Sequence, residues 1–128
     1  MTEEHYILDA SALLAMLGRE PGGDAVAMTL AVSAISTVNW SEVLQKARAH
    51  GIVVDGLDRE LVSLGLEFVP FGVAQAEAAA DVWFLGGRHL AFADRACLAT
   101  AVVDGSPVMT ADRAWSQIDA GVRVELIR

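Results

Sequence analysis

Cysteine, proline and long apolar runs are scarce in this chain of 128 residues, and each scarcity excludes a class of protein. A single cysteine, Cys97, cannot form an internal disulfide, which argues against a disulfide-stapled scaffold, and we interpret it as a core residue. Three prolines and no Ser/Gly-rich tract argue against disorder or a flexible linker. We therefore expect one compact domain, residues 1–128.

No apolar run reaches the roughly 18 to 20 residues that a membrane span requires. The chain begins with the acidic segment MTEEHYILDASALL, whereas a secretory leader begins with basic residues. These two observations predict a soluble cytoplasmic protein that does not contact the membrane.

Positive charge is scarce as well. The formal net charge is -8, Lys46 is the single lysine, and the arginines are scattered along the chain. Strong general affinity for a phosphate backbone normally requires clustered Lys and Arg. A nucleic-acid site in this chain must therefore depend on local charge, on bound cations or on a second subunit. The three histidines, His5, His50 and His89, lack the spacing of metal ligands, so we interpret them as surface or packing residues.

Short apolar segments alternate with helical patterns along the whole chain. Asp24 and Asn39 are expected to cap two of the helices, and Pro70 is expected to close the third strand. Such alternation predicts an α/β three-layer sandwich, with a five-stranded, mostly parallel sheet flanked by helices. The predicted strands are residues 6–8, 33–37, 67–71, 107–110 and 123–127, and the predicted helices are 11–17, 25–31, 39–50, 55–64, 73–86, 91–104 and 112–118.

Four acidic residues fall near the expected strand ends. Asp9 and Asp112 directly follow strands, Glu42 stands one turn into a helix, and Asp94 opens the helix before the fourth strand. Functional groups of open α/β sheets gather beyond the carboxyl ends of the strands, so all four carboxylates can meet at one edge.

Two interpretations of these acids remain open at this level. Each acid suits a helix cap or a first helical turn, and Asn39 with Glu42 resembles a capping box. Alternatively, the acids share one site, where their mutual repulsion requires a divalent cation. Carboxylate oxygens without Cys or His suit Mg²⁺ or Mn²⁺, which activate water for attack on phosphorus.

Four sequence blocks together resemble PIN-domain ribonucleases, specifically VapC-like toxins of toxin–antitoxin pairs. The blocks are ILDASALLAML, ISTVNWSEVLQKA, LAFADRACLATAVVDG and SPVMTADRAW, and they cover nearly the whole chain. The resemblance implies a catalytic, metal-binding set of Asp9, Glu42, Asp94 and Asp112, which holds one or two Mg²⁺ or Mn²⁺ ions. We expect Asp9 and Asp94 to bind the principal metal directly. Glu42 and Asp112 are expected to bind through water, to orient the nucleophile, or to help hold a second ion.

The resemblance also assigns supporting residues, products and partners. Thr110 matches a hydroxyl beside the acidic pocket. Ser11 is a candidate hydrogen-bond partner of Asp9 or an ordinary first-turn residue. Arg95 and Arg113 directly follow two of the acids, so apart from the resemblance they are candidate phosphate contacts or solvated helix residues. It implies RNA cleavage that leaves a 5′-phosphate and a 3′-hydroxyl. Dimer formation and silencing by a cognate antitoxin protein are implied too.

Other classes fit the sequence less well. A receiver-like phosphoacceptor domain requires paired acids after the first strand, whereas Asp9 stands alone, and a phosphatase with an aspartate nucleophile requires an acid where Ser11 stands. A catalytically inactive binding module remains an alternative. We expect Trp83, Phe84 and Trp115 in the core, and apolar helix surface around VAMTLAV or NWSEVLQ is a candidate partner groove.

Overall fold

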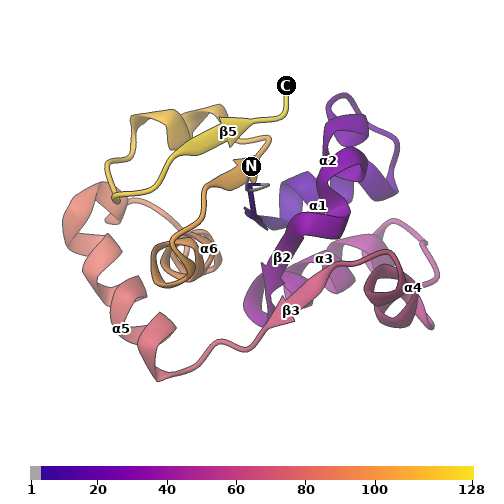
Figure 1. Ribbon diagram of the computed structural model, residues 1–128, viewed down its shortest axis with the longest axis horizontal. Coiled ribbons are helices and arrows are strands. Elements are labelled where there is room, and N and C mark those ends of the chain that lie inside the picture. Colours follow the sequence, from indigo (N-terminus) through magenta and orange to yellow (C-terminus); the bar gives the residue numbers. More distant parts are fainter. Residues whose placement is uncertain (1–3) are drawn as a thin grey trace.

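The computed structural model describes residues 4–128 and contains a five-stranded sheet with helices on both faces (Figure 1). Residues 1–3, which belong to the predicted domain and to the acidic start of the sequence, lie outside this range. The strand order is β3-β2-β1-β4-β5, and every neighbouring pair is parallel, so the predicted α/β sandwich is confirmed. The strands are β1 Tyr6–Leu8, β2 Ser33–Ser36, β3 Glu67–Val69, β4 Val108–Thr110 and β5 Val124–Leu126.

The connecting segments are helical. Within residues 4–128, no helix combines the length and the apolar character that a bilayer span requires. The helical elements are α1 Ala10–Leu17, α2 Gly23–Thr29, η1 Leu30–Val32, α3 Thr37–Ala49, α4 Leu57–Ser63, α5 Val73–Val82, η2 Trp83–Gly87, α6 Phe92–Asp104 and η3 Arg113–Gln117.

Successive residues of the central strands enter two separate cores, one on each face of the sheet. Leu8 and Ile35 pack against α1 to α4, whereas Ile7 and Ala34 pack against the side that contains α5, α6 and η3. Side chains alternate between the faces of a strand, and helices cover both faces here. Each central strand consequently carries two adjacent buried apolar residues, which are Ile7 and Leu8, Ala34 and Ile35, and Val108 and Met109.

Two predicted helix starts were wrong. The third long helix, α3, begins at Thr37 rather than near Asn39, because the Ser36 hydroxyl accepts the Val38 N–H at 3.2 Å and caps it. Asn39 is a buried residue of the first turn, so it forms no capping box with Glu42.

Helix α2 begins at Gly23, and its cap residue is Gly22, not Asp24. Gly22 has a φ of +88°, a conformation that glycine adopts without steric cost, and an added Cβ would overlap the carbonyl of Ile127. Close packing against the C-terminal segment therefore requires glycine at this cap position.

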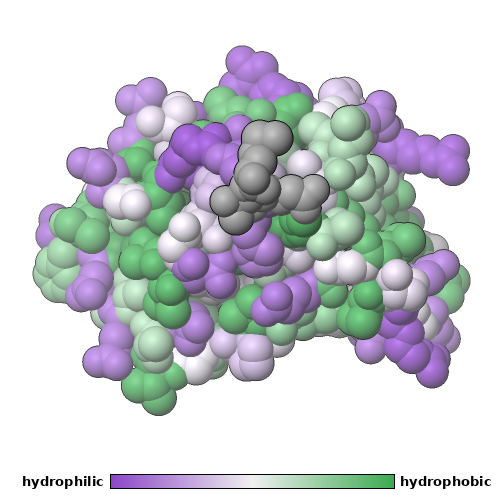
Figure 2. Space-filling view, viewed as in Figure 1, coloured by the Kyte–Doolittle hydropathy of each residue, from purple (hydrophilic) through white to green (hydrophobic). Residues whose placement is uncertain are grey.

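The segment after α5 also differs from prediction. The helix ends at Val82, and Leu85 and Gly86 have non-helical backbone angles, with a φ of +102° at Gly86. Phe84 is 77% exposed rather than in the core, whereas Trp115 is fully buried. Apolar side chains are therefore exposed on the surface near α5 and η2 (Figure 2).

Candidate functional site

The sheet topology marks one place for a ligand. From β1 the chain extends the sheet outward through β2 and β3, and it later returns to add β4 and β5 on the other side of β1. In open α/β sheets, ligands bind beyond the carboxyl ends of the strands at such a reversal. Asp9 directly follows β1 and Thr110 ends β4, so both residues stand at this reversal point.

A pocket of about 260 Å³ opens at this edge of the sheet. All four acids named from the sequence contribute to it, although they come from four different elements. The helix-capping interpretation also holds for two of the acids, because Asp9 caps α1 and Asp112 caps η3. The lining residues are Asp9, Ala10, Ser11, Glu42, Lys46, Ala91, Asp94 and Asp112.

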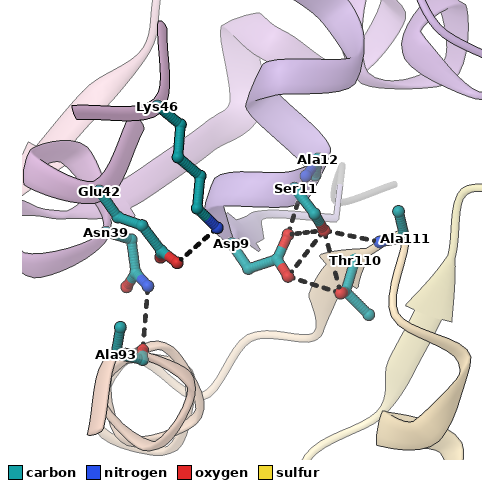
Figure 3. Close-up of polar contacts among 9 residues, drawn as sticks. All are labelled: Asp9, Ser11, Ala12, Asn39, Glu42, Lys46, Ala93, Thr110 and Ala111. Carbon is teal, nitrogen blue, oxygen red and sulfur yellow. Dashed lines mark hydrogen bonds and ion pairs between the residues drawn. The ribbon is translucent and has the colours of Figure 1, made fainter. Parts of the chain in front are cut away.

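Asp9 is the most tightly held of the four carboxylates, with 5% of its surface exposed. The Ser11 hydroxyl donates to it at 2.7 Å, the Ala12 N–H at 2.8 Å and the Thr110 hydroxyl at 2.6 Å (Figure 3). Burial raises the pKa of Asp9, and the donors from Thr110, Ala12 and Ser11 oppose that rise. These donors fix the orientation of the carboxylate at the base of the pocket.

The two hydroxyls also join the turns that follow β1 and β4. Ser11 Oγ accepts the Ala111 N–H at 2.9 Å, and Thr110 Oγ1 accepts the Asp112 N–H at 3.0 Å. The backbone that carries Asp112 is thereby positioned by the same groups that hold Asp9. This linkage explains why Ser11 and Thr110, which were assigned supporting roles, accompany the acids.

Glu42 approaches the pocket from the second turn of α3. Its carboxylate lies 3.0 Å from the Lys46 ammonium, one turn further along the same helix face. In Figure 3 both side chains extend from α3 toward Asp9. Lys46 was not among the residues predicted for the site, although it is the only lysine and stands four residues after an acid of the set.

Asn39 connects the two helices that carry Glu42 and Asp94. Its amide donates to the Ala93 carbonyl at 2.9 Å, and its side chain is 1% exposed (Figure 3). Glu42 lies one turn after Asn39, and Asp94 directly follows Ala93. This bond therefore helps to set the separation of the two acids, a role that the expected capping function had obscured.

Negative charge accumulates around Asp94. Burial, and then the charges of Glu42, Asp9 and Asp112, raise the pKa of Asp94 to about 6, while Lys46 lowers it. Repulsion from three other acids shows that the four carboxylates share one electrostatic environment. Such a set, with oxygen donors alone, is chemically suited to Mg²⁺ or Mn²⁺.

The acids do not stand in ready-made coordination geometry. Among residues 4–128, no three His, Cys, Asp or Glu side chains are grouped closely enough to hold an ion without movement. Glu42 is engaged with Lys46, and the Asp112 carboxylate accepts the Ala114 N–H at 3.0 Å. Each of these two carboxylates has one oxygen outside the named contact, and Glu42 is 24% exposed while Asp112 is exposed, so both side chains have room to move toward an ion.

The two arginines that follow the acids in sequence do not line the pocket. Arg95 Nη1 donates to the Ala79 carbonyl of α5 at 3.3 Å, and its guanidinium lies 5.6 Å from the centre of the Phe92 ring. Arg113 is exposed on η3. Lys46 is therefore the cation that the described residues place in the pocket.

Comparison with known proteins agrees with this architecture. A family profile described as PIN domain matches residues 6–121. A search of curated protein sequences finds no significant match.

Solved structures similar to the chain include a toxin–antitoxin complex from Klebsiella pneumoniae, with 17% identity, 96% of this chain and 98% of that chain covered, and a TM-score of 0.74. DNA-bound VapBC from Salmonella typhimurium has 16% identity, coverage of 98% and 100%, and a TM-score of 0.72. FitAcB from Neisseria gonorrhoeae has 19% identity, coverage of 95% and 97%, and a TM-score of 0.73. At these identities the likeness establishes the shared fold.

Proposed function

The chain belongs to the PIN domain family, and from this premise we propose that it is a metal-dependent endoribonuclease that acts as the toxin of a VapBC-type toxin–antitoxin pair. The observation that carries the proposal is the convergence of Asp9, Glu42, Asp94 and Asp112 on one pocket at the reversal point of the sheet. The reaction is hydrolysis of an RNA phosphodiester bond, which leaves a 5′-phosphate and a 3′-hydroxyl.

The roles of the acids follow from how each one is held. Asp9 is fixed by three donor groups, and Asp94 is subject to the charges of the three other acids, so we assign these two as the direct ligands. Glu42 and Asp112 act through water or hold a second ion. One or two bound Mg²⁺ or Mn²⁺ ions would supply a Lewis acid and lower the pKa of an attacking water.

The remaining residues of the pocket orient this set. Ser11 and Thr110 keep the Asp9 carboxylate from rotating, because their hydroxyls and the Ala12 N–H engage both of its oxygens. Asn39 keeps the turn that carries Asp94 at a set distance from α3. Preorganised charge of this kind is the main way in which enzymes stabilise a transition state.

The partners that we propose are a cognate antitoxin protein and a second copy of the chain. Support comes from solved structures of the same fold, one of which is a toxin–antitoxin complex, and from large apolar side chains on the surface. Met28 of α2 is 87% exposed, and Leu64, directly after α4, is 58% exposed; Phe84 and Leu85 form a separate exposed region. Exposed apolar side chains that gather into a contiguous patch are typical of protein interfaces.

The receiver-like alternative conflicts with the topology. Receiver domains have the strand order 2-1-3-4-5, whereas this sheet has the order β3-β2-β1-β4-β5. A binding module without catalysis would keep the fold without needing four acids in one pocket. The geometry therefore favours the nuclease over both alternatives.

The test is incubation of purified, antitoxin-free protein with total host RNA in Mg²⁺ or Mn²⁺, and separately in EDTA, with mapping of new 5′ ends. We expect discrete, metal-dependent cuts that an Asp94→Asn protein does not make. Given the net charge of -8, we also expect a few preferred sites instead of general digestion. A folded, metal-loaded protein that makes no cuts would favour the binding module.

A further inference from the structure

Lys46 is the one positively charged residue among the eight that line the acidic pocket. It reaches the pocket from α3, where its ammonium lies 3.0 Å from a carboxylate oxygen of Glu42. The Lys46 side chain is 52% exposed, so water still surrounds much of the ammonium. The lysine is thus close to the acids but is not locked among them.

The other cations near the site have different surroundings. Arg95 is held against α5 by the Ala79 carbonyl and by the Phe92 ring. Arg48, two residues after Lys46, faces away from the pocket and lines a separate hollow of α3 together with Ser41, Leu44, Gln45 and Ala49. Lys46 is consequently the basic side chain positioned to meet an anion that enters the pocket.

The ion pair between Lys46 and Glu42 is of a kind that exchanges readily. Exposed pairs four residues apart on a helix are weak, because water and salt compete with them. If Glu42 helped to hold a divalent ion, its charge would be shared with the ion and Lys46 would lose its partner. The anion that the reaction brings to this place is the RNA backbone.

We propose that Lys46 is a substrate-binding residue, which leaves Glu42 and contacts a backbone phosphate of the RNA that occupies the pocket. This inference rests on the proposed ribonuclease function. Four carboxylates and one ammonium give the pocket a formal charge of -3, and two divalent ions would change it to +1. The lysine therefore makes the metal-loaded pocket attractive to a phosphodiester in an otherwise acidic protein.

The test compares Lys46→Met with Lys46→Arg and with the matched control Arg48→Met, which removes a positive charge from the opposite face of the same helix. The probe is a fluorescein-labelled oligouridylate of about 12 nucleotides, and its binding is measured by anisotropy over a range of salt concentrations in Ca²⁺. We expect Lys46→Met to raise the Kd roughly tenfold and to reduce the slope of log K against log salt by about 0.7. Lys46→Arg should retain most of the affinity, and Arg48→Met should change the slope little.

A second measurement separates substrate binding from a structural role. Because Lys46 competes with the metal for Glu42, Lys46→Met should bind Mg²⁺ at least as tightly as the wild-type protein, by titration calorimetry. A parallel loss of Mg²⁺ and RNA binding would assign the lysine to structure and overturn the inference. An unchanged salt slope in Lys46→Met would also overturn the inference. The same holds if Arg48→Met changes RNA binding as much as Lys46→Met does, or if Lys46→Met loses binding to a partner protein but keeps RNA binding.

The cleavage assay keeps the two proposals distinguishable. If the wild-type protein cuts RNA while Lys46→Met binds the oligouridylate normally, the lysine inference fails alone. If the wild-type protein never cuts RNA but Lys46→Met still weakens binding in the predicted way, the nuclease function fails and the phosphate contact stands.

Discussion

The two edges of the sheet carry similar numbers of acidic side chains, but these acids differ in how many positively charged partners they have. At the amino ends of the strands, Arg123 pairs with Glu4 and Glu125, and His5 lies 3.0 Å from Asp104. At the carboxyl ends, four acids share Lys46. The acids of the first edge have partners that the fold itself supplies, whereas those of the second edge lack enough countercharge.

The pKa values of acids at the two edges are shifted in opposite directions. The Tyr6 hydroxyl, followed by the Arg123 guanidinium, holds the pKa of Glu4 below its ordinary value. Burial and neighbouring acids raise the pKa of Asp94 to about 6. A cation bound among these acids would relieve their mutual repulsion, and perturbed pKa values of this kind cluster at functional sites.

The largest expected effect is on catalysis. Asp9→Asn removes one charge of the metal-binding set while it keeps the size of the side chain, so we expect RNA cleavage to fall by about 100-fold or more. Glu4→Gln, at the amino edge, should leave the cleavage rate unchanged. Equal losses in the two variants, measured as initial rates at saturating Mg²⁺, would remove the functional distinction between the edges.

The next effect is on stability. Thr110→Val keeps the shape of a fully buried side chain but removes the donor that contacts Asp9 at 2.6 Å. Loss of a buried hydrogen bond to a carboxylate should lower the free energy of unfolding by about 1 to 3 kcal/mol, measured by urea denaturation. The matched control Tyr6→Phe removes an exposed donor to Glu4 and should cost less. A larger loss in Tyr6→Phe would contradict this assignment.

A smaller effect concerns pH. The folded pKa of Asp94, about 6, lies above its ordinary value of 3.8, so the folded chain binds this proton more tightly than the unfolded chain. The resulting stability is fully present below about pH 4 and is lost as the pH rises through 6. In EDTA, we expect this group to contribute a decrease on the order of 1 to 2 kcal/mol.

Asp94→Asn provides the control for that titration. The variant should lack this component of the pH dependence, and in EDTA it should be more stable than the wild-type protein at pH 7. Urea midpoints between pH 4.5 and 7.5 measure both quantities. Identical pH profiles for the two proteins would contradict the inferred repulsion around Asp94.

The smallest effect is expected from Arg123→Met. The arginine pairs with Glu4 and Glu125 at an exposed position, where water and salt reduce the strength of ion pairs. We expect little change in the thermal midpoint at physiological salt and none in cleavage. A loss of stability as large as that of Thr110→Val would show that the amino edge is energetically as important as the carboxyl edge.

Much of the architecture could be predicted because it depends on short-range patterns. The alternation of short apolar segments with helical ones predicted the layers, and the placement of Asp9 and Asp112 after strands predicted the edge where they lie. Helix ends were harder, since Ser36 and Asn39 are both acceptable caps. In the folded chain the Ser36 hydroxyl caps α3, and the Asn39 amide donates to the Ala93 carbonyl instead.

Residue types and periodicity were therefore enough to predict the α/β class, the four acids of the pocket and the chemistry of their oxygen donors, because both are local properties. The partner of each side chain became clear only from the folded chain. The tertiary structure turned Arg95 toward α5, exposed Phe84, and brought Lys46 into the acidic pocket. These outcomes depend on contacts between segments far apart in the chain, which local pattern does not specify.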